Sequence, residues 1–274
     1  MSGGPAAVRW RHQLEAWAIP QALLDGVPWN PYEWPAELFA RRDRQRVAEG
    51  VEPPTFDIVM GFEPRTVLDI GAGTGGSCLT LAERGVHVTA LERDEGMAQR
   101  LRSEAARRGL EVEVIEAAWP EAASSAPVVD VVTTSHVVHN VPDLAPFLAA
   151  MADHATRAVV IQEFEQHPWA HLGPYYKALH GLDRPTGPTV DDLVAVVYET
   201  LGVEPEVLRW DSGRPMWFQD RHELYLFYGR RLVVPEQRWQ ELNDVLGPYV
   251  VERPDGTVQL EERTKQLATV WWEV

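Results

Sequence analysis

Short apolar runs and segments of helical periodicity alternate along the chain from residue 65 to residue 165. The apolar runs lie at 65–71, 86–92, 111–117, 128–136 and 157–164. Between several of these runs, apolar residues recur at the three- and four-residue spacing of amphipathic helices, in 75–85, 96–109 and 143–155. Strands that alternate with helices of this length predict right-handed βαβ units and a parallel sheet. The pattern therefore predicts an α/β fold.

The alternation is interrupted at residues 165–188, a segment rich in His, Tyr, Trp, Gly and Pro that is longer than a usual connection. A helix with Thr189 as its N-cap is expected next. It is followed by a predicted strand at 205–210, two helices at 220–233 and 235–246, a hairpin turn at 254–256 and a last strand at 264–274. Trp271 and Trp272 are neighbours in that strand, so we expect them to pack on opposite faces of a sheet.

Residues 1–60 show no strand pattern. Trp10, Leu14 and Trp17 lie near helical spacing before Pro20 interrupts it, and a second helix is expected at 37–50. Four of the eleven tryptophans fall within the first 34 residues, at Trp10, Trp17, Trp29 and Trp34. We predict that residues 1–60 form a helical cap or lid, and that residues 61–274 form the main domain with an insertion at about 165–188.

Composition excludes several classes of protein. The 274 residues include 41 acidic and 25 basic side chains, a formal charge of −16, and such a surface repels nucleic-acid phosphates. There is no apolar run of 18 residues and no recognisable signal peptide, so we expect a cytoplasmic protein with no membrane partner. The single Cys78 and the absence of a spacing such as H-E-x-x-H predict no metal site. The oligomeric state is not indicated by the sequence.

The most informative motif is VLDIGAGTGG at residues 67–76, where a buried strand runs through glycines directly into a helix. Glycines let a backbone approach a ligand closely, and a helix N-terminus presents unpaired N–H groups. Glu92 lies at the end of the next strand, where a carboxylate can accept hydrogen bonds from ribose hydroxyls. The glycine spacing satisfies both the G-x-G-x-x-G dinucleotide fingerprint and a D-x-G-x-G-x-G pattern that begins at Asp69.

Two further stretches favour the second pattern. VLDIGAGTGG is followed by ALERDEGM at 90–97 and by SHVVHNVPDLAPFL at 135–148. In this order the three stretches resemble class I S-adenosylmethionine-dependent methyltransferases, and the third resembles their bacterial small-molecule branch. The resemblance covers roughly residues 60–165. It implies a Rossmann-like seven-stranded sheet of order 3-2-1-4-5-7-6 with strand 7 antiparallel, helices on both faces, and S-adenosylmethionine as cofactor.

The resemblance also implies which residues hold the cofactor. Asp69 would organise its ammonium group, Glu92 would bind the ribose, and Arg93 and Met97 would flank the adenine. The whole predicted set is Asp69, Gly71, Ala72, Gly73, Gly75, Glu92, Arg93, Met97, Ala118, Trp119, Ser135 and His136. Where the family often has an acid near the adenine, this chain reads Ala117-Ala118-Trp119. Trp119 is therefore expected either to stack on the purine or to pack at a helix start.

The acceptor site is expected above the carboxyl ends of the strands. Histidine has the intrinsic pKa of a general base, and the candidates are His139 or His167, with His136 next. The residues predicted to bind the acceptor are Asn140, Glu163, Trp169, Tyr175, Tyr176 and Trp17. The predicted activity is O- or N-methylation of a small molecule in bacterial secondary metabolism. The alternatives are methylation of a protein or ribosomal RNA, a cofactor-binding protein without catalysis and, least favoured, a nicotinamide dehydrogenase.

Overall fold

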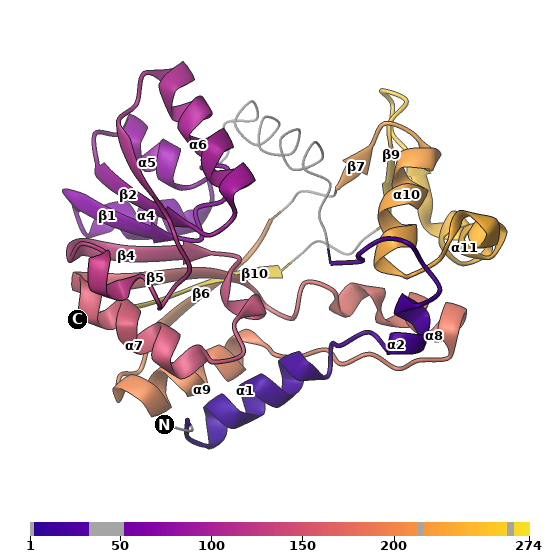
Figure 1. The fold of residues 1–274 in the computed structure, drawn as a ribbon, viewed down its shortest axis with the longest axis horizontal. Helices are drawn as coiled ribbons and strands as arrows, with labels where there is room; N and C mark the ends of the chain where they lie inside the picture. The colour runs from indigo at the N-terminus through magenta and orange to yellow at the C-terminus, as the bar shows by residue number, and fades with distance from the viewer. Residues whose placement is uncertain (1–2, 33–51, 213–215, 262–265) are drawn as a thin grey trace.

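A seven-stranded sheet forms the centre of the molecule in a computed structural model that describes residues 3–32, 52–212, 216–261 and 266–274 (Figure 1). The strand order is β3-β2-β1-β4-β5-β10-β6. Strand β10 runs antiparallel to both β5 and β6, and the other pairs are parallel. This order confirms the prediction, with β10 as the antiparallel seventh strand. The strands are β1 Thr66–Ile70, β2 His87–Glu92, β3 Val112–Glu116, β4 Val129–Ser135, β5 Ala155–Phe164, β6 Glu206–Asp211 and β10 Gln266–Glu273.

Helices cover both faces of this sheet, and each face has its own hydrophobic core. One core lies under α4 (Pro54–Gly61), α5 (Cys78–Glu83) and α6 (Glu95–Arg108). The other lies under α7 (Leu144–His154), α9 (Val190–Leu201) and α1 (Pro5–Glu15). Trp271 packs against the first core and Trp272 lies in the second, which confirms that these neighbours face opposite sides.

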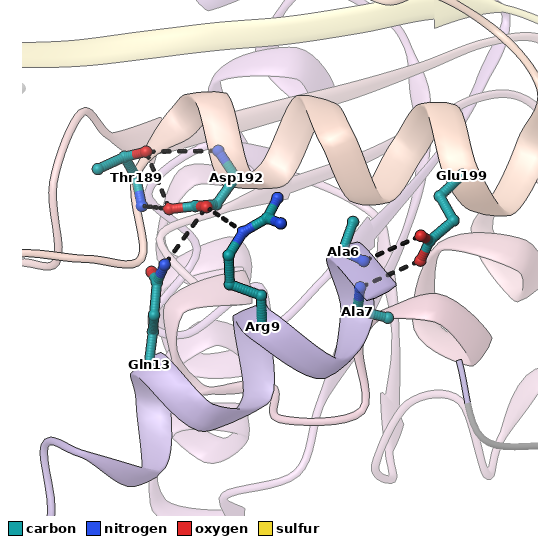
Figure 2. A network of polar contacts seen from close by, with 7 residues as sticks. All are labelled: Ala6, Ala7, Arg9, Gln13, Thr189, Asp192 and Glu199. Carbon is teal, nitrogen blue, oxygen red and sulfur yellow. Dashed lines mark hydrogen bonds and ion pairs between the residues drawn. The ribbon is translucent and has the colours of Figure 1, made fainter. Parts of the chain in front are cut away.

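Helix α1 is attached to α9 by a network of polar contacts (Figure 2). The carboxylate of Glu199 accepts hydrogen bonds from the backbone N–H groups of Ala6 and Ala7, at 2.9 and 3.1 Å. Near the other end of α1, Asp192 accepts hydrogen bonds from Arg9 and Gln13, while its own N–H is capped by Thr189. A carboxylate at a helix N-terminus satisfies free N–H groups and favours the helix dipole.

The same helix contributes to the main core. Ala6, Ala7 and Trp10 are buried within it, and the indole of Trp10 donates a hydrogen bond to the carbonyl of Val141 at 2.9 Å. Trp10 is therefore a core residue, whereas a place in a lid was expected for it. The helix predicted at 37–50 and Trp34 lie outside the described residues.

A smaller unit with its own core lies beside the main sheet (Figure 1). The predicted insertion supplies the 3-10 turn η3 (Ala170–Leu172) and α8 (Gly173–His180). The rest of the unit comes from residues 216–261: β7 Trp217–Phe218, α10 Arg221–Arg231, α11 Trp239–Leu246, β8 Val250–Glu252 and β9 Val258–Leu260. Strands β8 and β9 pair antiparallel around the 254–256 turn, which confirms the predicted hairpin. The insertion is thus not an isolated loop, because its apolar side chains are buried against these later elements.

In the described parts of the chain, no helix combines the length and apolar character that crossing a lipid bilayer demands.

Candidate functional site

The glycine motif forms a tight loop between β1 and α5. Gly71, Gly73 and Gly75 have φ values of +71°, +59° and +98°, in the left-handed region that side chains disfavour. A Cβ atom on Gly71 would come within 2.4 Å of Val137 Cγ2, so this glycine also permits a close approach to the loop after β4. A Cβ atom on Gly73 would meet no atom within 4 Å. The loop is therefore packed on one side and has open space on the other.

Glu92 joins this loop to the end of β2. Its carboxylate accepts hydrogen bonds from the N–H of Gly73 and from the N–H of Asp94, both at 2.8 Å. An ionised carboxylate has about four acceptor positions, so Glu92 can accept further bonds from ribose hydroxyls. The N–H groups of Gly71 and Ala72 donate to the carbonyl of Leu91, at 2.8 and 3.1 Å, which closes the loop onto the same strand.

The other residues predicted to hold the cofactor lie at or just beyond the carboxyl ends of β1 to β4. Asp69 is buried near the end of β1, two residues before Gly71. Arg93 is exposed after β2, Met97 lies in the first turn of α6 beside the N-cap Asp94, and Ala118 is exposed after β3. Ser135 ends β4 with its hydroxyl 3.4 Å from that of Ser77. The fold thus brings these positions to one edge of the sheet.

Trp119 is a packing residue in this structure. Only 8% of its surface is exposed, and it belongs to the core between the sheet and α7. Its indole N–H donates to the carbonyl of Phe147 at 3.2 Å, and its ring meets His154 edge-on. An indole enclosed in this way has little of its surface left to stack on a purine. Of the two roles that the sequence left open, the structure favours packing.

A cavity of about 160 Å³ lies between α4, α5 and the sheet, directly beside the glycine loop. Its lining includes polar side chains from the start of α5 and the ends of the central strands, among them Ser77, Thr133, Ser135 and Gln162. Space lined by hydroxyl and amide groups at this edge of the sheet suits the polar end of a bound ligand.

Four groups predicted from separate parts of the chain meet after β4 and β5. His139 Nδ1 lies 2.9 Å from Glu163 Oε1, and His136 Nδ1 lies 3.8 Å from the same oxygen. The imidazole of His167 lies edge-on to that of His139, with 6.0 Å between ring centroids. We refer to His136, His139, Glu163 and His167 as the histidine cluster. No group of three or more His, Cys, Asp or Glu side chains within the described residues is arranged to hold a metal ion.

Hydrogen bonds distinguish the three imidazoles. The side-chain amide of Gln162 donates a hydrogen bond to Nε2 of His136 at 2.9 Å. The backbone N–H of Trp169 donates one to Nδ1 of His167 at 3.3 Å. One ring lone pair is therefore occupied in each of these two histidines. His139 directs Nδ1 at Glu163, and within the described chain its Nε2 has no hydrogen-bond partner. Among the three candidates, His139 alone keeps its basic nitrogen available.

The electrostatics of the cluster support the same distinction. Burial and, to a smaller extent, the electrostatic influence of His139 lower the pKa of His167 to about 3, while Glu163 opposes the shift. Such an imidazole is neutral and a weak base at physiological pH. The prediction that His167 serves as the base is therefore disfavoured. Burial raises the pKa of Glu163, but His139 and His136 lower it more strongly, so the net pKa is well below the ordinary value.

Aromatic side chains surround the histidine cluster. Trp17 stacks on His167 with 4.1 Å between centroids, Trp169 stacks on Tyr32 at 5.5 Å, and Phe164 lies 4.4 Å from His136. Trp17 and Trp169 were predicted from the sequence as acceptor-binding residues. Tyr32, Phe164 and Gln162 were missed, although Gln162 and Phe164 flank the predicted Glu163 in β5.

Three predicted acceptor-binding residues have other positions in the structure. Tyr176 is fully buried in the core of the smaller unit, where its hydroxyl donates to the carbonyl of Arg231, so it is not an acceptor-binding residue. Tyr175 packs near Tyr249 in the same unit, with 6.1 Å between their rings. Glu163 is only 4% exposed and faces His139 and His136, so its carboxylate is directed at these histidines instead of at open space. Asn140 is exposed beside His139.

Comparison with known proteins adds independent information. Residues 67–157 match a family model described as a methyltransferase domain. Over 115 residues the chain is 32% identical to the ubiquinone biosynthesis O-methyltransferase of Aeromonas salmonicida (strain A449), a match that covers 41% of this chain and 48% of the relative. The chain therefore matches about half the length of this curated relative.

Solved structures of low sequence identity are also similar. A putative methyltransferase from Bacillus halodurans C-125 is 15% identical, with 76% of this chain and 91% of that chain covered and a TM-score of 0.49. Magnesium protoporphyrin IX methyltransferase from Synechocystis PCC 6803 is 14% identical, with 96% and 84% covered and a TM-score of 0.47. The matched family segment contains the glycine loop, Glu92 and His139, whereas Glu163, His167 and Trp17 lie outside it.

Proposed function

We propose that this protein transfers the methyl group of S-adenosylmethionine to a hydroxyl group of a small molecule, because residues 67–157 match a family model described as a methyltransferase domain. The observation that carries this proposal is the placement of His139, with its Nε2 available, in the segment after β4 whose Val137 lies against Gly71 of the glycine loop. S-adenosylmethionine, when bound, supplies an electrophilic methyl group on a sulfonium. The residues of the chain must then hold the reactants in line and accept the proton of the hydroxyl.

The described residues fit this cofactor. The open side of Gly73 leaves room for a ligand against the backbone, and the carboxylate of Glu92 is held at the loop by two N–H groups. Glu92 would bind the ribose hydroxyls, the glycine loop would lie against the methionine part, and Asp69 would organise its ammonium group. Ser135 and the polar cavity beside α5 are available to the same end of the ligand.

His139 is the proposed general base. A hydroxyl must lose its proton as the new C–O bond forms, and an imidazole with a free Nε2 can accept that proton. Phenolic hydroxyls have a pKa near 10, far closer to that of an imidazole than aliphatic alcohols, so a phenol or enol is the favoured acceptor. The aromatic rings of Trp17, Trp169 and Phe164 around the cluster fit a flat, partly apolar molecule.

Two further observations support the acceptor class. The name of the Aeromonas relative describes an O-methyltransferase of ubiquinone biosynthesis, which is a reaction on a small molecule. The formal charge of −16 disfavours an RNA acceptor, because binding to nucleic acid draws its affinity from basic groups.

An acceptor screen tests this proposal. The protein is incubated with isotope-labelled S-adenosylmethionine and a panel of phenols, catechols, hydroxyquinones, aliphatic alcohols and amines, and methylated product is measured by mass spectrometry. We expect product from phenolic acceptors, and we expect His139→Ala to lower kcat by about 100-fold or more. His139→Ala should bind the cofactor normally in calorimetry, and the exposed His87, at the far end of β2, gives a matched control as His87→Ala. Cofactor binding without product from any acceptor would contradict methyl transfer to a small molecule.

A further inference from the structure

The carboxylate of Glu163 is held in place by the backbone. Glu163 lies one residue before the end of β5. Its Oε1 accepts the N–H of Phe164 at 2.8 Å, and its Oε2 accepts the N–H of His139 at 3.3 Å. Both donors are main-chain groups, so the carboxylate keeps its position whatever the orientation of the histidine rings.

Two imidazoles converge on this fixed group. His139 donates from Nδ1 to Oε1 at 2.9 Å, and the Nδ1 of His136 lies 3.8 Å from the same oxygen. The amide of Gln162 occupies Nε2 of His136, which places the ring proton of His136 on Nδ1, toward Glu163. Glu163 therefore accepts a hydrogen bond from His139, while Nδ1 of His136 faces the same oxygen at the longer distance of 3.8 Å.

Only one of the two histidines is thereby left as a base. In His136 the lone pair of Nε2 is occupied by the amide of Gln162, so its other nitrogen, Nδ1, carries the ring proton and is not basic. His139 uses Nδ1 alone, which leaves the lone pair of Nε2 for a reacting group. Isolated imidazoles favour the opposite tautomer, with the proton on Nε2, so a partner is needed to hold the proton on Nδ1.

We propose that Glu163 is the positioning residue of this site: it holds His139 in the Nδ1–H tautomer that directs a basic Nε2 at the acceptor, with His136 as a second ring on the same carboxylate. This inference rests on the proposed function. Glu163 itself touches no acceptor, because it is almost completely buried.

Glu163 also stabilises the charge that forms on His139 during the reaction. As the acceptor oxygen forms its bond to the methyl carbon and the carbon–sulfur bond breaks, the hydroxyl proton passes to Nε2 of His139. The ring then carries a positive charge 2.9 Å from the Glu163 carboxylate, which stabilises it. The products are the methyl ether, S-adenosylhomocysteine and a proton on His139 that later returns to solvent.

Imidazole nitrogen NMR tests the positioning role without any acceptor. In protein labelled with ¹⁵N-histidine, the signals of His139 are identified by their loss in His139→Gln. We expect a protonated Nδ1 and an unprotonated Nε2 in the wild type, and a shift toward Nε2–H in Glu163→Gln. Glu165→Gln is the matched control, because Glu165 is two residues away and pairs with Arg209 outside the cluster. An unchanged His139 tautomer in Glu163→Gln would overturn the proposal.

Kinetics supply the second readout. We expect Glu163→Gln to lower kcat by about 10- to 100-fold with the KM for S-adenosylmethionine unchanged, and Glu163→Asp to recover part of the loss. Equal losses in Glu163→Gln and Glu165→Gln would show a merely structural role and overturn the inference. If Glu163→Gln does not fold, Glu163→Asp, whose carboxylate is withdrawn by one methylene, should still lower kcat relative to Glu165→Gln, and wild-type kcat in Glu163→Asp would overturn the inference. A wild-type enzyme that methylates no acceptor would contradict the proposed function, whereas the His139 tautomer would still decide the role of Glu163.

Discussion

The imidazole of His167 lies flat against the indole of Trp17, with ring centroids 4.1 Å apart and ring planes 16° from parallel. Trp17 follows α1 near the N-terminus, and its indole N–H donates to the carbonyl of Gly187 at 2.6 Å. The guanidinium of Arg184 lies over the same indole. The N-terminal segment and the 165–188 segment are thus joined at the edge of the histidine cluster, and this junction explains why His167 is withdrawn from water.

The buried His167 predicts a specific dependence of stability on pH. Its pKa in the folded protein is about 3, below the ordinary value of 6.5 that it regains on unfolding. Between these values the unfolded chain binds a proton that the folded chain does not, so stability falls as the pH falls from 6.5. The titration of His167 changes the unfolding free energy by at most about 1.4 kcal/mol per pH unit. The change is smaller than this limit because the ring keeps some contact with water.

Urea unfolding at pH 7, 6, 5 and 4 measures this slope. We expect His167→Phe, which keeps a ring against Trp17 and removes the titrating group, to show a shallower loss of unfolding free energy than the wild type. The exposed His87→Ala should retain the wild-type slope. A slope that His167→Phe leaves unchanged would mean that His167 is not neutral in the folded protein.

Glu92 should control cofactor affinity. Glu92→Ala removes the proposed ribose contacts and the two hydrogen bonds that hold Gly73 and Asp94. Hydrogen bonds to a charged group contribute about 1.5–3 kcal/mol, so we expect the Kd for S-adenosylmethionine to rise by at least about tenfold in calorimetry. Glu95→Ala, an exposed change in the adjacent helix turn, should leave the Kd within about twofold. Equal affinities for both variants would place the ribose elsewhere.

Gly71 should be restricted by its neighbour as well as by its backbone angle. Gly71 and Gly85 have similar φ values of +71° and +82°, but a Cβ on Gly85 meets nothing within 4 Å, whereas on Gly71 it would strike Val137. We expect Gly85→Ala to cost about 1–2 kcal/mol of unfolding free energy, the cost of the left-handed conformation, and Gly71→Ala to cost more. Adding Val137→Ala should recover part of the extra loss. Equal costs at Gly71 and Gly85 would rule out a steric role for Val137.

The attachment of α1 to α9 should contribute to global stability. Removing the carboxylate that caps α1, in Glu199→Ala, should lower the unfolding free energy by about 0.5–2 kcal/mol, as loss of a helix cap does elsewhere. Trp10→Ala should cost about 3–5 kcal/mol because it empties a core position. Glu204→Ala, an exposed change just beyond α9, is the control. Wild-type stability in Trp10→Ala would restore the idea of a separable lid.

Local patterns predicted much of this molecule because their physical causes are local. Strand and helix order follow from side-chain periodicity, and the glycine loop follows from backbone angles that glycine adopts most readily. The 254–256 turn and the opposite orientations of Trp271 and Trp272 are likewise properties of short segments. The strand order came from resemblance to a family, and the observed sheet confirms it.

The roles of individual side chains depended on contacts between distant segments. His139 follows β4 whereas Glu163 lies in β5, and nothing in either segment alone shows that one carboxylate faces two imidazoles. Trp119 had two equally reasonable roles until its contact with Phe147 placed it in the core. The sequence by itself determined the fold class and the glycine loop. Only the tertiary structure decided which histidine keeps a free nitrogen, because that depends on which donors and acceptors packing brings within hydrogen-bond distance.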